Sequence, residues 1–155
     1  MRRVAFVSAW LIFAASVAGW AEERPTAPVA VVVGVSSHVT SIDADTLRDL
    51  FLRRRLLLED GAKAVPINLP VGDALRERFS ILVLGRKPAE LSAYWDRLYF
   101  DGVRPPIVLP SAEAVRRYLQ IDPHAIGYLA PEAVDATLRV LVVFPAGGQA
   151  PTARR

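Results

Sequence analysis

The chain has 155 residues, 19 of them Lys or Arg and 16 Asp or Glu, which gives a formal net charge of +3. It contains no cysteine, and this excludes disulfides, thiolate catalysis and zinc held by cysteine. The weak basic balance, without a concentrated basic face or aromatic platforms, argues against a nucleic-acid partner.

The N-terminus has the features of a removable export signal. Two arginines among the first three residues precede an apolar run, and small residues stand at Ala18, Gly19 and Ala21. The run of about 14 residues is shorter than the roughly 20 that a membrane-spanning helix needs. We therefore expect residues 1–21 to be a signal peptide, followed by a periplasmic protein without stable membrane insertion. A retained N-terminal anchor is the alternative.

The rest of the chain is predicted to be one domain with short flanking segments. Residues 22–28 are polar and proline-rich and should form a flexible lead. Residues 29–144 are enough for a single hydrophobic core. Residues 145–155 are rich in Gly, Pro and Ala and are predicted to be a disordered tail.

The first predicted strand is the β-branched run Val29–Val33, which is typical of a strand buried on both faces. Thr40–Asp43 has the spacing of a capping box and predicts the start of a helix. The apolar residues of that helix share one face and should pack on the sheet: Leu47, Leu50 and Phe51.

A second strand is predicted at Val65–Leu69, followed by a tight turn at Pro70–Gly72 and a helix that opens at Asp73. The inward face of this helix is predicted from the spacing of Leu75, Phe79, Leu82 and Val83. Gly85 is the expected C-cap of the helix.

In the second half of the chain, Pro88 is predicted to begin a helix whose inward side carries Leu91, Tyr94, Trp95 and Leu98. The remaining elements alternate between strand and helix. They are a strand at Ile107–Leu109, a helix capped by Ser111, a strand at Ile126–Leu129, a helical turn at Pro131–Ala136 and a strand at Leu138–Phe144.

This alternation predicts an α/β domain with a mostly parallel sheet covered by helices on both faces. In such sheets ligands lie at the carboxyl ends of the strands, and two loops follow strands here. A strand–turn–helix junction can present backbone N–H groups to an anion, and hydroxyls or a guanidinium can add to it. The candidate ligand-binding residues are Ser36, Ser37, Gly72, Asp73, Ala74 and Arg76.

Each candidate also has a structural interpretation. Ser36 and Ser37 could belong to a polar loop, and Arg76 could pair with Asp73 or Glu77 at the surface. The run Arg53–Arg55 is best interpreted as a solvated helix end. His38 and His124 are too far apart in the sequence to suggest a metal site, and no catalytic, phosphate-loop or dinucleotide motif is present. We therefore expect neither enzymatic activity nor a cofactor.

Five stretches together resemble the phosphate-binding group of type 2 periplasmic substrate-binding proteins, which serve ABC transporters. They are VAVVV, SIDADTLRDLFLRRR, VPINLPVGDALRERF, AYWDRLYFDG and HAIGYL. The resemblance implies a periplasmic, non-enzymatic binding protein. It also implies that this chain supplies roughly one lobe of a fold that closes two lobes around its ligand.

In the family that the chain resembles, a Ser-Gly-Thr turn at a helix N-terminus contacts phosphate. The matching residues here are Val71, Gly72 and Asp73, so only the glycine is kept. A carboxylate beside a phosphate dianion lowers affinity by like-charge repulsion. Two functions therefore stay open. The protein could bind inorganic phosphate or another small oxyanion for an ABC transporter, or it could be a fold without ligand that binds an envelope protein.

Overall fold

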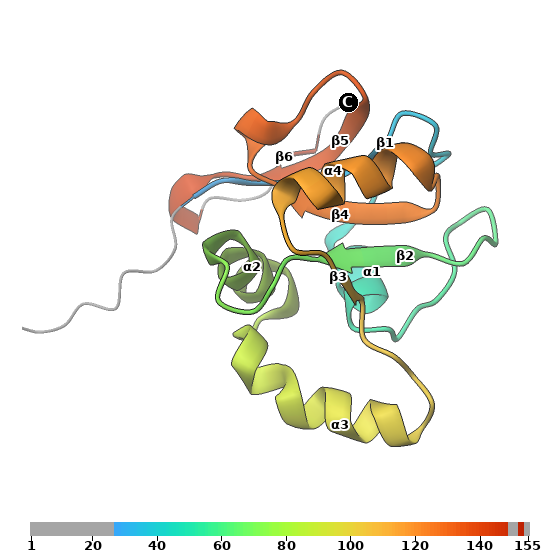
Figure 1. Ribbon diagram of the computed structural model, residues 1–155, viewed down its shortest axis with the longest axis vertical. Helices are drawn as coiled ribbons and strands as arrows, with labels where there is room; N and C mark the ends of the chain where they lie inside the picture. Colours follow the sequence, from blue (N-terminus) through green and yellow to red (C-terminus); the bar gives the residue numbers. More distant parts are fainter. Residues whose placement is uncertain (1–26, 149–151, 154–155) are drawn as a thin grey trace, which may run out of the picture.

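The computed structural model describes residues 27–148 and 152–153, so the predicted signal peptide at residues 1–21 lies outside the described residues. Six strands form one sheet in the order β3-β2-β4-β1-β5-β6, and helices lie on both of its faces (Figure 1). The strands are β1 Val29–Gly34, β2 Val65–Asn68, β3 Ile107–Val108, β4 Ala125–Leu129, β5 Leu138–Phe144 and β6 Thr152–Ala153. The α-helices are α1 Ala44–Phe51, α2 Ala74–Phe79, α3 Ser92–Phe100 and α4 Ala112–Ile121.

The predicted α/β class is confirmed, but the sheet is mixed rather than mostly parallel. β2 runs parallel to β3 and β4, whereas β1 is antiparallel to both β4 and β5, and β6 is antiparallel to β5. The prediction rested on continuous apolar runs such as that of β1. Such a run reports burial on both faces, and β1 is buried at every position, yet it carries no information about strand direction.

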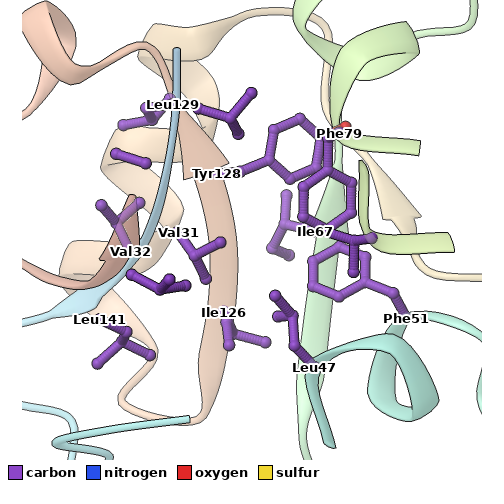
Figure 2. Close-up of a cluster of buried hydrophobic side chains, with 14 of the residues drawn as sticks. Val31, Val32, Leu47, Phe51, Ile67, Phe79, Ile126, Tyr128, Leu129 and Leu141 are labelled. Carbon is purple, nitrogen blue, oxygen red and sulfur yellow. The ribbon is translucent and has the colours of Figure 1, made fainter. Parts of the chain in front are cut away.

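One face of the sheet packs against α1 and α2. Successive side chains of β4 point to opposite faces, and Ile126 and Tyr128 point toward these two helices (Figure 2). Phe51 of α1 and Phe79 of α2 meet there with ring centroids 4.6 Å apart. The ring of Phe79 stacks on that of Tyr128 at 3.9 Å, so three aromatic rings join both helices to the centre of the sheet.

The other face packs against α4, and two glycines make this approach possible. A Cβ at Gly127 would lie 3.0 Å from Cγ1 of Val115 on α4. A Cβ at Gly34 would lie only 2.0 Å from the carbonyl oxygen of Leu119, closer than any side chain can come. The last turn of α4 therefore rests directly on the backbone of β1.

The predicted caps are largely confirmed. Asp73 and Ser111 are the N-caps of α2 and α4. Asp43 caps α1 by accepting a hydrogen bond from Thr46 N at 2.8 Å, so α1 begins after Asp43 and its cap is not Thr40. Gly85, with a φ of 71°, ends a π-helical stretch, Ser80–Leu84, that continues α2.

The region that begins at Pro88 is more loosely packed than predicted. It starts as a 3₁₀ turn, Pro88–Leu91, and α3 itself contains no buried residue. Among the expected inward side chains Leu91 is buried, and Tyr94 and Trp95 are only partly buried against the core. The hydroxyl of Tyr94 donates to the carbonyl of Leu52 at 2.7 Å and so ties α3 to the end of α1. Figure 1 shows α3 set apart from the sheet.

The predicted disordered tail, residues 145–155, contains ordered backbone. Ala146–Gly148 form a 3₁₀ turn, and β6 pairs with β5 through Val142 and Val143. The prediction of disorder does not hold for these residues, because main-chain hydrogen bonds to an edge strand need no apolar side chains. No helix in the described ranges is long and apolar enough to cross a membrane.

Candidate functional site

The turn after β2 is closed by the carboxylate of Asp73. Its Oδ1 accepts from the backbone N–H of Leu75 at 2.9 Å and of Arg76 at 3.1 Å. The N–H of Asp73 itself donates to the carbonyl of Pro70 at 3.2 Å. Gly72 has a φ of +92°, a left-handed conformation that favours glycine. The chain therefore supplies its own anion to the two amides that an N-terminal oxyanion site would use.

Arg76 lies behind this turn and is buried, with 6% of its surface exposed. Its Nη1 donates to the carbonyl of Leu69 at 3.4 Å, and its Nε is buried without a partner. Among the described residues no carboxylate forms an ion pair with it, so the predicted surface pairing with Asp73 or Glu77 is wrong. The whole side chain is buried, the guanidinium together with the aliphatic stem, and helical spacing did not predict this.

A second buried arginine lies on the same helix. Arg78 is also 6% exposed, and its Nη2 donates to the carbonyl of Pro145 at 3.3 Å just after β5. Its Nε is buried without a partner, as in Arg76. Burying a guanidinium without a counter-charge is costly. The short helix α2 thus carries two buried cations that no carboxylate among the described residues neutralises by an ion pair.

Tyr128 of β4 places a buried hydroxyl beside the end of β2. Its hydroxyl accepts from Leu69 N at 3.2 Å and donates to Oδ1 of Asn68 at 3.3 Å. Burial raises the pKa of Tyr128 to about 12, although the charge of Arg76 acts in the opposite direction. Sequence reasoning missed this residue. The available signal was a tyrosine in a strand buried on both faces, because its hydroxyl must find a partner there.

The other predicted loop, after β1, is held by Arg139 of β5. The guanidinium of Arg139 donates to the carbonyls of Ser37 at 2.8 Å, Val39 at 3.1 Å and Val35 at 3.1 Å. Ser37 is buried, and its hydroxyl accepts from Val39 N at 3.3 Å, whereas Ser36 is exposed. The polar-loop interpretation fits Ser37, because its hydroxyl stabilises its own loop.

The structure does not bring the two predicted loops together. β1 is antiparallel to β4 and β2 is parallel to β4, so β1 and β2 run in opposite directions. Their carboxyl ends therefore lie at opposite ends of the strands of the sheet. Ser36 and Ser37 are therefore separated from Gly72, Asp73, Ala74 and Arg76 by the length of a strand, about 17 Å for six residues. Convergence was predicted from a parallel arrangement, and the antiparallel β1 removes it.

The run Arg53–Arg55 is only partly a solvated helix end. Arg54 and Arg55 are exposed, but Arg53 is half-buried with a φ of 59°, and its Nη1 donates to the carbonyl of Ala64 at 3.3 Å. Burial lowers the pKa of Arg53. Within the described ranges no group of three His, Cys, Asp or Glu side chains could hold a metal ion.

Comparison with known proteins gives structural neighbours only. No protein-family model and no curated protein sequence matches the chain. An ABC-type phosphate transport receptor from Vibrio cholerae matches with a TM-score of 0.59 and 16% identity, over 75% of this chain and 46% of that one. A phosphate ABC transporter substrate-binding protein with bound phosphate from Clostridium perfringens gives 0.60 and 17%, over 75% and 45%. PstS from Borrelia burgdorferi gives 0.55 and 18%, over 81% and 50%.

The chain spans about half the length of these neighbours, and at such low identity the match concerns the fold. The open α/β sheet with helices on both faces therefore has the fold of these neighbours, and the chain corresponds to roughly one lobe of that fold.

Proposed function

We propose that this protein is an exported, periplasmic binding domain that takes a small oxyanion, with inorganic phosphate the first candidate, and passes it to an ABC transporter. The observation that carries the proposal is the guanidinium of Arg76, buried directly behind the turn at the carboxyl end of β2 without a carboxylate partner. An oxyanion at the turn would supply the missing counter-charge. The structural neighbours include a phosphate transport receptor and a substrate-binding protein with bound phosphate, which supports the same chemistry.

The carboxylate of Asp73 limits the affinity that such a site can reach. It occupies the N–H groups of Leu75 and Arg76, and its charge repels an anion at the same turn. The amides of Gly72 and Ala74 and the Arg76 guanidinium remain as donors for the oxyanion. Because only one side of the ligand is covered in this arrangement, we expect weak binding.

Calorimetry of the purified protein with phosphate and with sulfate tests this function. Binding to the native state must also raise the melting temperature, and a ligand at ten times its Kd adds about 1.4 kcal/mol of stability. Arg76→Met should remove the heat of binding. A wild-type protein that gives neither heat nor a melting shift at millimolar phosphate and sulfate would contradict oxyanion binding.

A second candidate function is an envelope interaction module that retains the fold without the small ligand. The observation that favours it is the pair of capping bonds of Asp73, which already satisfy the N–H groups of Leu75 and Arg76 at this turn. Asp73→Thr distinguishes the two. If this substitution creates phosphate binding where the wild type has none, the turn is a site that has lost its ligand. A stoichiometric partner recovered from envelope extract would then identify the interaction.

Export itself is tested by cell fractionation together with N-terminal sequencing of the mature protein. A new N-terminus at residue 22, 20 or 19 in the periplasmic fraction is the expected result. An intact N-terminus in the membrane fraction would instead indicate the retained anchor.

A further inference from the structure

A cavity of about 320 Å³ lies beside α1, at the sheet edge opposite the Asp73 turn. It is open to solvent on one side and is lined by the loop between β1 and α1, by α1 itself and by the segment from Arg55 to Asp60. Its volume is near the lower limit of small-molecule sites, and at the liquid volume of water it would hold about ten heavy atoms.

The floor of the cavity is apolar. Val39, Ile42, Leu50 and Leu58 line it. Leu50 and Leu58, together with Ala64, form a small hydrophobic cluster separate from the main core. A ligand with an aliphatic portion would cover this surface and remove it from water.

The rim carries an excess of negative charge. Three carboxylates line it, those of Asp43, Glu59 and Asp60, against the single guanidinium of Arg55, so its net charge is about −2. Arg55 is engaged with the protein itself, because its Nε donates to the carbonyl of Leu57 and its Nη1 to the hydroxyl of Thr46.

The carboxylates keep acceptor capacity for a ligand. Oδ1 of Asp60 accepts from Ala62 N, and Oδ1 of Asp43 accepts from Thr46 N. Glu59 has no hydrogen-bond or ion-pair partner in the part of the chain that the structure describes. Hydrogen bonding by Thr46 lowers the pKa of Asp43, which keeps that carboxylate ionised at neutral pH.

We propose that this cavity binds a small organic cation, an alkylammonium whose aliphatic chain covers the apolar floor and whose ammonium group lies among the three rim carboxylates. Charge complementarity favours this occupant over an anion, which the same carboxylates repel. The site is separate from the oxyanion turn and has the opposite sign of charge. It does not depend on the function proposed above.

The test is an NMR titration of the purified protein with pentylammonium, using pentanol and pentanoate as neutral and anionic probes of the same length. We expect saturable amide shifts at Val39, Ile42 and Leu58 with pentylammonium, weaker shifts with pentanol and none with pentanoate. Raising the salt concentration should weaken the pentylammonium response, because the rim carboxylates are exposed.

Two isosteric variants locate the ammonium group. Glu59→Gln and Asp60→Asn should each weaken pentylammonium binding by up to about fivefold, the range expected of exposed ion pairs. Asp60→Asn retains an Oδ1 that can accept from Ala62 N. Glu132→Gln removes an exposed carboxylate outside the cavity and should change nothing. Equal shifts with pentanoate, unsaturable shifts spread over the surface, or full affinity in both rim variants would overturn the proposal.

Discussion

The buried hydroxyl of Tyr128 offers the sharpest test of how this fold is stabilised. Tyr128→Phe keeps the ring, and therefore the stacking on Phe79 at 3.9 Å, but removes both hydrogen bonds of the hydroxyl. The N–H of Leu69 and the Oδ1 of Asn68 are then left buried without that partner. Orphaning buried polar groups costs about 1–3 kcal/mol. The melting temperature should fall by roughly 4–12 °C for a domain of this size.

Urea unfolding of the wild type, Tyr128→Phe and the control Tyr99→Phe provides the measurement. Tyr99 is 66% exposed, so its hydroxyl should contribute within about 0.5 kcal/mol. We expect the midpoint to fall for Tyr128→Phe while the slope with denaturant stays the same. If Tyr128→Phe is as stable as Tyr99→Phe, the hydroxyl of Tyr128 has no structural role and the reasoning is refuted.

The same pair of proteins makes a prediction about alkaline pH. The pKa of Tyr128 is about 12 in the folded protein, above the usual value of about 10 for the unfolded chain. The stabilisation of the folded protein that this pKa shift reflects is therefore fully present below pH 10, and it is lost as the pH rises from 10 to 12. At pH 11 the loss amounts to about 1.4 kcal/mol. Tyr128→Phe should lack this loss, so its stability difference from the wild type should narrow between pH 9 and pH 11.

Three further predictions concern packing, the buried cation and acid stability. Gly34→Ala should destabilise the protein by about 3 kcal/mol or more in urea unfolding, because its Cβ would lie 2.0 Å from a backbone oxygen of α4. In phosphate-free buffer, Arg76→Met should have a urea midpoint equal to or higher than that of the wild type, because an unpaired buried charge is replaced by an apolar side chain. A clearly lower midpoint would mean that the charge stabilises the free protein. Hydrogen bonds from Thr137, and to a smaller extent from Arg116, lower the pKa of Asp135. The ionised carboxylate therefore stabilises the folded protein above about pH 4, and this stabilisation is lost as the pH falls through the lowered pKa. Asp135→Asn should therefore be less stable than the wild type at pH 7 and equal to it at pH 2, as followed by thermal unfolding.

The sequence was sufficient for the elements whose signals are local. The β-branched run of β1 and the caps at Asp73 and Ser111 depend on a few neighbouring residues, and the structure has them where they were predicted. Helical spacing also placed Phe79 of α2 inward, and it is fully buried, although Leu75 is only partly buried. These features need no knowledge of what the segment packs against.

Strand direction and the site could not be predicted in the same way. Direction depends on which strands pair across more than 90 residues of chain, as Ala30 does with Leu129, and no local pattern records it. The burial of Arg76 was missed because its long aliphatic stem can pack inward although its type usually marks the surface. The sequence places Tyr128 in a strand, but its hydrogen bonds with Asn68 of β2 and with Leu69 just after β2 depend on the tertiary structure.

The position of β1 in the sheet has a consequence for folding. β1 is the first strand of the described chain, yet both of its neighbours come from the last third, with Ala30 opposite Leu129 and Val29 opposite Phe144. The centre of the sheet can form only after loops of about 100 residues have closed, and such non-local pairing is slow. A nascent or truncated chain without β4 and β5 leaves β1 with two open edges. Neither edge of β1 can therefore complete its hydrogen bonding until nearly all of the chain is available.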